Sequence, residues 1–266
     1  MAPIRKGDGT PLEIPGVSEV RSGDGRVFFE GGIPDSVTDY WPADEGDGSV
    51  LGNNEGDTDM TMNFATWVND TKYEGDTAPQ WDGVDDVAGM EEDNPFPASP
   101  EQFTYMIWLS DVVAADTDGN ARVTQGVAVS TDGEGGSGSV FNPDDGWVLI
   151  LNNDNIDDIR LQVRENDSAT NVVGTTTIPD PTANDIFLAV TGDGDDMRLR
   201  VYASDGKQVD ESGNGSRGIV TDGHLHVGSS GAEAHHVAGV MDAIGMAVDE
   251  AMPESEITDY WESTLR

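Results

Sequence analysis

The feature that most constrains the fold is an Asp-Gly pair that occurs ten times along the chain. Asp-Gly accommodates the positive φ angles of a tight hairpin turn, so each pair marks a place where one strand can turn into the next. Short segments with the composition of strands lie between these pairs, and several alternate polar and apolar residues with period two, as in residues 198–202 (RLRVY). The pattern predicts an all-β fold of antiparallel strands.

The strands and one helix are expected from residue 37 onwards. Only Glu254–Thr264 has the features of a helix, with Pro253 before it and an acidic first turn. The predicted strands are Phe103–Leu109, Arg122–Ser130, Gly146–Asn152, Ile159–Arg164, Phe187–Thr191, Met197–Ala203, His224–Val227 and Val240–Val248. Many short strands with a single helix indicate an antiparallel β-sandwich.

A series of motifs then follows in a fixed order over about residues 37–265. It comprises residues 39–48 (DYWPADEGDG), 64–68 (FATWV), 81–86 (WDGVDD), 103–108 (FTYMIW), 199–206 (LRVYASDG), 239–244 (GVMDAI) and 253–260 (PESEITDY). This series resembles the LamG-like jellyroll domains of the concanavalin A-like lectins and glucanases. The resemblance implies a jellyroll sandwich over 37–266 that ends in a short helix. Trp81 stands where that family usually has Phe, and Ala243 where it usually has an acidic residue.

The charge of the chain limits its partners and its setting. There are 52 acidic and 13 basic side chains, with 35 Asp and only three Lys. This balance excludes nucleic acid and anionic membrane surfaces as default partners, because both attract Lys and Arg clusters. Apolar runs such as Trp147–Leu151 are too short to insert across a bilayer. Scattered carboxylates are typical of proteins from extreme halophiles, since molar salt shortens the Debye length to about 3 Å and screens their repulsion.

Composition changes at about residue 36. Residues 1–36 carry four basic and six acidic side chains, whereas the remaining 230 residues carry nine basic and 46 acidic ones. The first segment holds one short apolar strand near Arg26–Phe29 and several apolar residues that are costly to expose. We therefore predict an extended arm over 1–36 that docks on another chain in a homo-oligomer, in preference to a floppy tail. No apolar stretch follows Arg5 and Lys6, so we expect no signal peptide.

Calcium is the ligand that the motifs favour, because it takes six to eight oxygens from carboxylates and carbonyls in loops. The resemblance implies Asp82 and Asp242 as its ligands, with Asp44 as a weaker third. Two further Asp-rich loops, residues 116–120 and 193–196, have suitable composition. The alternative for all of these positions is ordinary turn chemistry on an acidic surface.

The four histidines lie within thirteen residues, at His224, His226, His235 and His236. His224 and His226 share one face of a predicted strand, so a zinc or nickel site is conceivable if the following segment returns. A polar strand edge is the favoured interpretation.

The sequence offers no pattern for catalysis. A glycosidase of this fold needs two carboxylates about 5–10 Å apart, and no Glu-x-Asp-x-x-Glu strand or Gly-x-Ser-x-Gly turn occurs. We therefore predict that the protein is not an enzyme. Five tryptophans fall at positions that are core in the family pattern, and the sixth lies on the helix, so none remains as a platform for sugar stacking: Trp41, Trp67, Trp81, Trp108, Trp147 and Trp261.

The start of the chain favours one class of function. Gly7–Pro11 and Ser22–Phe29 resemble the starts of LamG-like virion proteins of haloarchaeal tailed viruses. This resemblance implies a virion structural protein, a tail fibre, baseplate component or capsid turret, on an extracellular particle. The arm would contact other virion proteins, and the lectin-like domain would bind a host surface glycan or glycoprotein. The alternatives are a non-catalytic cell-surface carbohydrate-binding module of an extreme halophile and, less favoured, a secreted glycanase.

Overall fold

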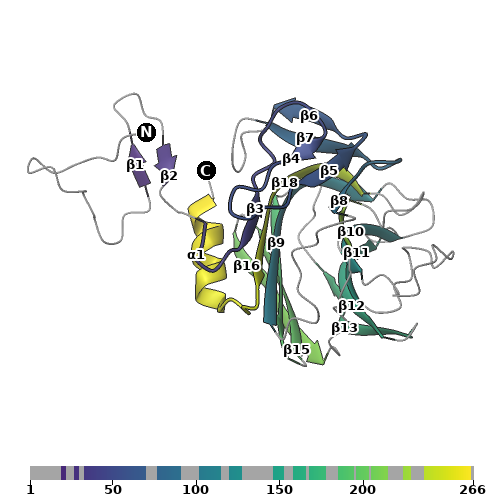
Figure 1. Ribbon diagram of the computed structural model, residues 1–266. Helices are drawn as coiled ribbons and strands as arrows, with labels where there is room; N and C mark the ends of the chain where they lie inside the picture. Colours follow the sequence, from purple (N-terminus) through teal and green to yellow (C-terminus); the bar gives the residue numbers. More distant parts are fainter. Residues whose placement is uncertain are drawn as a thin grey trace, which may run out of the picture.

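The computed structural model describes the chain in separate segments, in some of them the backbone alone. They are residues 19–21, 27–29, 33–69, 77–90, 102–114, 120–127, 146–152, 158–165, 168–177, 185–194, 196–203, 205–214, 224–228 and 237–264. Two large antiparallel sheets face each other as the layers of a sandwich, and one helix, α1 (Glu254–Thr264), lies against the outside of one of them (Figure 1). The predicted all-β antiparallel jellyroll with a C-terminal helix is confirmed.

The first sheet carries the helix. Its strands run in the order β16-β15-β14-β9-β18-β7-β6, and β3 pairs with β18. The central pairs β14-β9, β9-β18 and β18-β7 join strands that are far apart in sequence, as expected of a jellyroll. The bounds are β3 (Asp39–Trp41), β6 (Thr66–Asn69), β7 (Thr77–Asp82), β9 (Gln102–Ala114), β14 (Ile186–Asp193), β15 (Asp196–Ala203), β16 (Gly206–Asn214) and β18 (Val237–Val248).

The second sheet has the order β13-β12-β11-β10-β17-β8-β5-β4. Its strands are β4 (Val50–Leu51), β5 (Met60–Asn63), β8 (Val87–Met90), β10 (Asn120–Val127), β11 (Gly146–Asn152), β12 (Asp158–Glu165), β13 (Ser168–Thr177) and β17 (His224–Val227). The β5–β6 and β7–β8 connections cross from one sheet to the other, so the chain changes layer twice within about 30 residues.

The main core lies between the sheets, because its buried apolar residues come from both of them. On β9 alternate side chains, Tyr105, Ile107 and Leu109, point into this core, as the period of two in a strand requires. Trp147 of the second sheet meets them, with its ring 5.4 Å from that of Tyr105. Four of the six tryptophans are fully buried, and Trp67 packs at the core margin.

A second core joins the helix to the outer face of the first sheet. The other alternate residues of β9, Met106 and Trp108, meet Ile257, Tyr260 and Trp261 of α1 in this cluster. Those three helical residues recur at the spacing of one helix face. Trp261 therefore packs down onto the sheet.

The segment before β3 is attached to the helix. Ile33 packs on the second core, and the Ser36 hydroxyl donates a hydrogen bond of 2.6 Å to Glu256 Oε1. Farther upstream, β1 (Glu19–Arg21) and β2 (Val27–Phe29) pair antiparallel. The division of the chain at residue 36 and the docking role of the arm stay predictions.

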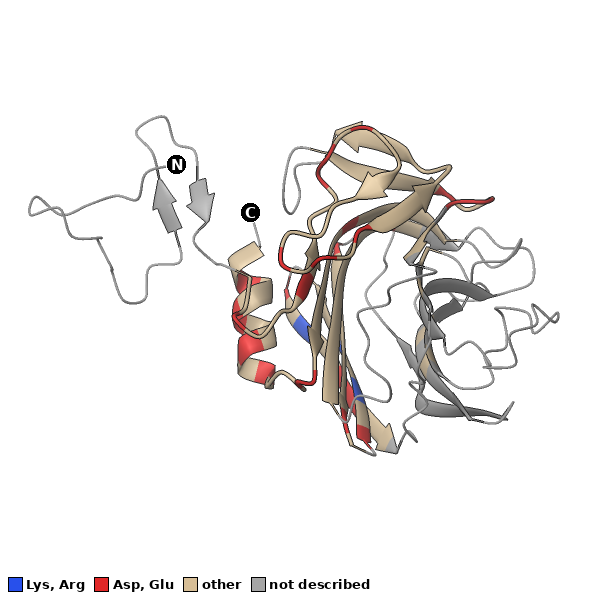
Figure 2. Cartoon of the chain, in the orientation of Figure 1, with Lys and Arg blue, Asp and Glu red and all other residues tan. Residues whose placement is uncertain are grey.

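Acidic residues are spread over the loops and the helix, as Figure 2 shows. The Lys and Arg residues whose side chains the structure describes lie in β15 and β16 instead. Within the described segments, no helix has the length and hydrophobicity needed to span a membrane.

Candidate functional site

The two crossings between the sheets meet at one end of the sandwich. Asn63 of β5 pairs with Val87 of β8, and Thr66 of β6 pairs with Gln80 of β7. The turn at Phe64 and Ala65 therefore lies beside the turn formed by residues 83–86. These turns form the rim of the candidate site.

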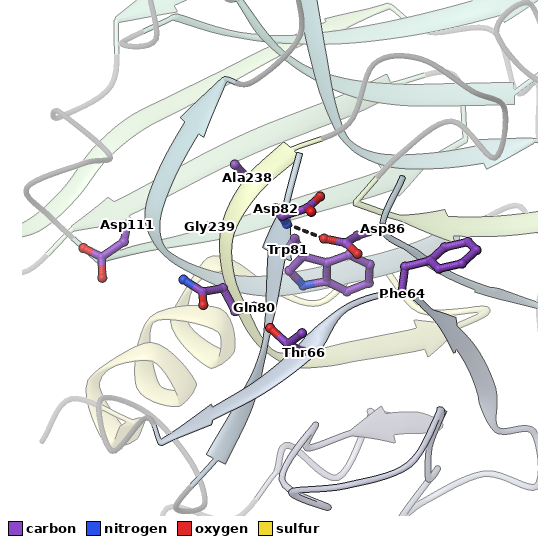
Figure 3. Close-up of a pocket in the computed structure, with 9 residues that line it drawn as sticks. All are labelled: Phe64, Thr66, Gln80, Trp81, Asp82, Asp86, Asp111, Ala238 and Gly239. Carbon is purple, nitrogen blue, oxygen red and sulfur yellow. Dashed lines mark hydrogen bonds between the residues drawn. The ribbon is translucent and has the colours of Figure 1, made fainter. Parts of the chain in front are cut away.

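A pocket of about 360 Å³ opens at this rim (Figure 3). It spans four adjacent strands of the first sheet, because the register places Trp81 of β7 opposite Gly239 of β18, with β6 and β9 on either side. Its lining residues are Phe64, Thr66, Gln80, Trp81, Asp82, Asp86, Asp111, Ala238 and Gly239.

The backbone at position 239 requires a glycine. Its φ is +150°, and a Cβ built on it would come within 2.8 Å of the Cα of Val112. The contact is with backbone, which cannot move aside as a flexible side chain could. A glycine here lets β18 and β9 approach closely under the pocket.

Phe64 is the residue that the sequence analysis missed. Its side chain is 72% exposed, and its φ is +68°, which is a genuine outlier for a bulky residue. On β5 Met60 and Met62 are buried while Thr61 and Asn63 are exposed. If this alternation continued, the side chain of Phe64 would point into the core. The backbone turns at Phe64 and the ring faces outward. An exposed aromatic held in a costly conformation at a pocket is a candidate for ligand contact.

Three carboxylates gather in the turn between β7 and β8. Asp82, Asp85 and Asp86 each offer an oxygen, and these oxygens lie within 4.8 Å of one another. The Asp82 N–H donates to Asp86 Oδ2, and the Val84 N–H donates to Asp82 Oδ1 at 2.8 Å. Gly83, with φ of +80°, allows the tight turn. We name Asp82, Asp85 and Asp86 the acidic triad.

Asp86 is the buried member of the triad, with 2% exposure. Burial raises its pKa from 3.8 to about 6, and the charges of Asp82 and Asp85 add to this shift. The hydrogen bond from the Asp82 N–H favours the ionised form and lowers the pKa, but it does not offset the burial. A cation bound to the triad would relieve the repulsion.

The structure brings only one of the three expected calcium ligands into the triad. Asp82 belongs to it, together with Asp85 and Asp86, which the sequence analysis did not name. Asp242 is buried in β18, where its Oδ1 accepts from the Ala243 N–H at 2.8 Å. It lies four positions beyond Ala238, the partner of Asp82, or roughly 13 Å along the strand.

Asp44 lies near the opposite end of β7. Its carbonyl oxygen accepts a hydrogen bond of 3.0 Å from Thr77 Oγ1, and Thr77 begins the strand that Asp82 ends. The expected roles of Asp44 and Asp242 as metal ligands stay predictions.

The other predicted sites are only partly described. Residues 116–119 of the 116–120 loop lie outside the described residues, as does Asp195 of the 193–196 loop. Asp193 accepts a hydrogen bond of 2.8 Å from Gln102 Nε2. His224 and His226 lie on β17, but their side chains, and the whole of His235 and His236, are outside the described part, so this cluster also stays a prediction.

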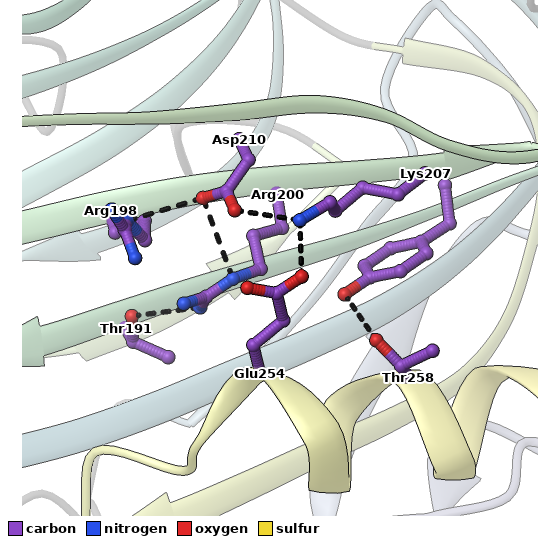
Figure 4. A network of polar contacts seen from close by, with 8 residues as sticks. Thr191, Arg198, Arg200, Lys207, Asp210, Glu254 and Thr258 are labelled. Atoms are coloured by element: carbon purple, nitrogen blue, oxygen red, sulfur yellow. Dashed lines mark hydrogen bonds and ion pairs between the residues drawn. The ribbon is translucent and has the colours of Figure 1, made fainter.

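A second polar cluster lies under the helix (Figure 4). Asp210 of β16 accepts from Lys207 Nζ at 2.8 Å and lies 3.1 Å from Arg198 Nε, while Lys207 also pairs with Glu254 of α1. Burial opposes ionisation of Asp210, but the hydrogen bond from Lys207 and the nearby Arg charges outweigh it, so the pKa of Asp210 is lowered. Because these charges pair with one another, the cluster attaches α1 to the sheet.

Comparison with known proteins extends the evidence for the fold. Neither a family model nor a curated protein matches the sequence. Among solved structures, domain 4 of AbnA, a GH43 extracellular arabinanase from Geobacillus stearothermophilus in complex with arabinotriose, is similar with a TM-score of 0.56 and 14% identity. The match covers 84% of this chain and 97% of that domain.

Two further structures share the architecture. The botulinum neurotoxin serotype D binding domain has a TM-score of 0.56 at 10% identity, over 86% of this chain. A mutant of Trypanosoma rangeli sialidase displaying trans-sialidase activity has a TM-score of 0.54 at 13% identity, over 87%. The chain spans about half of the neurotoxin domain and about a third of the sialidase, 52% and 34%. At these identities the likeness establishes a shared β-sandwich fold.

Proposed function

We propose that the protein is a non-catalytic, lectin-like subunit of a halophilic virus particle, whose jellyroll binds a glycan on the host cell surface. The observation that carries this proposal is the rim pocket, with the exposed ring of Phe64 beside several polar groups. Its volume is in the range of small-molecule sites.

The lining suits a sugar. An exposed aromatic ring can pack against the C–H face of a pyranose, while hydroxyl groups donate to carboxylates and to amide oxygens. The pocket supplies Asp82, Asp86 and Asp111 as acceptors, and Gln80 as both donor and acceptor. Two of the similar structures are a domain in complex with arabinotriose and a binding domain of a neurotoxin, which supports a role in recognition.

The place of the protein on a particle is supported by its sequence. The low-charge segment 1–36 and the highly acidic remainder suit an anchor and an outward-facing head in molar salt. Residues 33–36 contact α1, whereas the pocket lies where the chain crosses from one sheet to the other. The proposed anchor and the proposed recognition site therefore use different elements. A cell-surface carbohydrate-binding module of a halophile is the alternative, and detection of the protein in purified particles distinguishes the two.

We further propose that the acidic triad holds calcium. Three carboxylates in one turn supply hard oxygen ligands, and carbonyls and water can complete the six to eight that calcium takes. The ion would fix the turn that forms one wall of the pocket.

A glycosidase is the second candidate, because the pKa of Asp86 is raised to about 6, a value suited to a general acid. Asp86 is nevertheless 2% exposed and accepts from the backbone of its own turn. We therefore expect no release of reducing ends from oligosaccharides that the protein binds.

A glycan array probed in molar potassium chloride tests the proposal. The wild-type protein should bind a subset of glycans saturably, and Phe64→Ala should lose at least tenfold in affinity. Val50→Ala is the matched control, since Val50 is another exposed apolar residue, on β4, and does not line the pocket. A folded protein that binds no glycan, or equal losses in the two variants, would overturn the proposal.

A further inference from the structure

We infer that the rim pocket selects uncharged glycans and rejects anionic ones, such as uronates, sialates and sulfated sugars. This inference rests on the proposed glycan-binding function and names the ligand class of the same site. Two observations carry it: the sign of the charge around the pocket and the surplus of acceptors in its wall. A buried donor without a partner supports ligand binding at the same wall.

All the charged groups that line the pocket are acidic. Asp82, Asp86 and Asp111 contribute to the wall, and Asp85 stands next to them in the triad. The described Lys and Arg side chains are in the cluster under α1, where they pair with Asp210 and Glu254. An anionic ligand would therefore enter a negative pocket without a cationic side chain from the described wall.

The wall has a surplus of acceptors. A carboxylate only accepts hydrogen bonds, whereas a sugar hydroxyl both donates and accepts. Hydroxyl-rich neutral sugars can therefore donate hydrogen bonds to the Asp side chains, while a uronate replaces a hydroxyl group with a carboxylate that cannot donate and that these side chains repel. Leaving polar groups of a site unpaired is the strongest means of discrimination between similar ligands.

The wall also contains a donor that needs an oxygen. Trp81 lines the pocket with 1% exposure, and its indole Nε1 is buried without a hydrogen-bond partner in the described part of the chain. Figure 3 shows this nitrogen on the side of the ring that faces Gln80 and Thr66. The opposite edge of the indole packs against Gly228, where a Cβ would lie 2.8 Å from Cε3. The donor thus lies on the side of the indole next to two other residues of the lining, where it can bind a ligand oxygen.

Neither bound calcium nor molar salt should remove the preference for neutral over anionic glycans. One Ca²⁺ on the triad leaves the four carboxylates with an excess of negative charge, so rejection is weaker with calcium and stronger after chelation. Molar salt screens charges separated by more than about 3 Å, but it acts much less on groups in contact inside a pocket.

Matched pairs of trisaccharides test the inference. The probes are gluco-, galacto- and manno-trisaccharides and their uronate counterparts, which differ by a carboxylate at each C6, measured by calorimetry in molar potassium chloride with calcium and with chelator. We expect the neutral member of any bound pair to bind at least tenfold more tightly, with a larger ratio in chelator. Equal binding, or tighter binding of the uronate, would overturn this inference and leave the proposed function standing. Binding of neither class would overturn both.

The charge effect is isolated by Asp111→Asn. Asp111 has φ of +51°, which Asn tolerates, and it is not part of the triad, so calcium binding is not disturbed. The variant should lower the ratio of the affinity for the neutral trisaccharide to the affinity for its uronate counterpart at least threefold. Asp249→Asn is the matched control, because Asp249 is also exposed with φ of +62° but lies ten positions from Gly239, roughly 30 Å along β18. An unchanged ratio in Asp111→Asn, or an equal change in the control, would contradict the inference.

Discussion

The backbone N–H of Asp82 donates a hydrogen bond to the side chain of Asp86, so a buried carboxylate closes the turn between β7 and β8. This turn forms one wall of the rim pocket and holds the acidic triad. Its geometry therefore links the stability of the turn to the proposed cation binding and the proposed ligand recognition, and each link can be measured.

Asp86 makes the stability of the fold depend on pH. Its pKa is about 6 in the folded protein and 3.8 in the unfolded chain, so the folded state binds the proton more tightly. The resulting stabilisation is fully present below pH 4 and is lost as the pH rises through 6, with a total of roughly 2 kcal/mol. Asp86→Asn keeps an acceptor for the Asp82 N–H and should flatten this part of the profile. Denaturant titrations between pH 4 and 7 in chelator test this prediction. An identical dependence of the free energy of unfolding on pH in the wild type and in Asp86→Asn would contradict it.

Calcium should stabilise the protein through the triad. A ligand that binds only the folded state at one hundred times its Kd adds about 2.7 kcal/mol to the free energy of unfolding. Chelator should lower the Tm of the wild type, and Asp85→Asn should abolish the difference. Asp85 is exposed, so this variant should not perturb the apo fold. The same measurement on Asp44→Asn and Asp242→Asn tests the ligands expected from sequence. A calcium effect that survives in Asp85→Asn would rule out the triad.

Gly239→Ala should be strongly destabilising, by about 2–4 kcal/mol, because the new Cβ meets the backbone of Val112. Gly206→Ala is the control, since Gly206 also has positive φ, +117°, but has nothing within 4 Å of the added Cβ. It should cost only about 1 kcal/mol. Thermal unfolding of both variants gives the comparison, and equal shifts in Tm would show that the contact with Val112 is unimportant.

The buried and the exposed ion pairs under α1 should differ in how much they contribute to the free energy of unfolding. Arg200 is 4% exposed, with Nε 3.6 Å from Asp210 Oδ1, so Arg200→Met should lower the free energy of unfolding by roughly 2 kcal/mol. The pair of Lys207 and Glu254 is largely solvated, and Lys207→Met should cost less than about 1 kcal/mol. Denaturant titrations of both variants test this order, and the reverse order would contradict it.

Phe64→Asn separates binding from folding. Asn tolerates the positive φ of this position, and the ring it replaces is 72% exposed, so little packing is lost. The free energy of unfolding should stay within about 1 kcal/mol of the wild type, with any change in the stabilising direction. A clear loss of stability would mean that the ring supports the turn, and the argument for ligand contact would lose its basis.

From residue 37 onwards the predicted strands all lie after residue 102, where eight of the ten described strands were expected, whereas β3–β8 were not predicted as strands. Residues 146–152, 224–227 and 254–264 have the bounds expected. After residue 102 the missed strands are β13 and β16, which are the outermost strands of their sheets. An edge strand needs hydrogen bonds on one side only and can be almost wholly polar, as residues 206–214 (GKQVDESGN) are. Periodicity carries no signal for such a strand.

The site was less predictable than the fold for a related reason. Asp82, Asp85 and Asp86 lie within five residues of one another, so the motif at residues 81–86 located their turn, although it named only Asp82 as a ligand. The relation of Asp82 to Asp242 depends on the register of β18, which shifts between Ala238 and Val240 and again between Met241 and Ile244. Such irregularities arise from packing between distant strands, and no local pattern encodes them.

The most direct test of the account is competition for adsorption to host cells. Purified protein in molar salt is added to haloarchaeal cells before a virus of the kind proposed to carry it, and free virus is counted over time. The account predicts saturable binding of the wild type and a matching block of adsorption, both of which Phe64→Asn loses while Val50→Ala keeps them. A folded wild-type protein that neither binds nor competes, or a Phe64→Asn variant that competes as well as the wild type, would contradict the account.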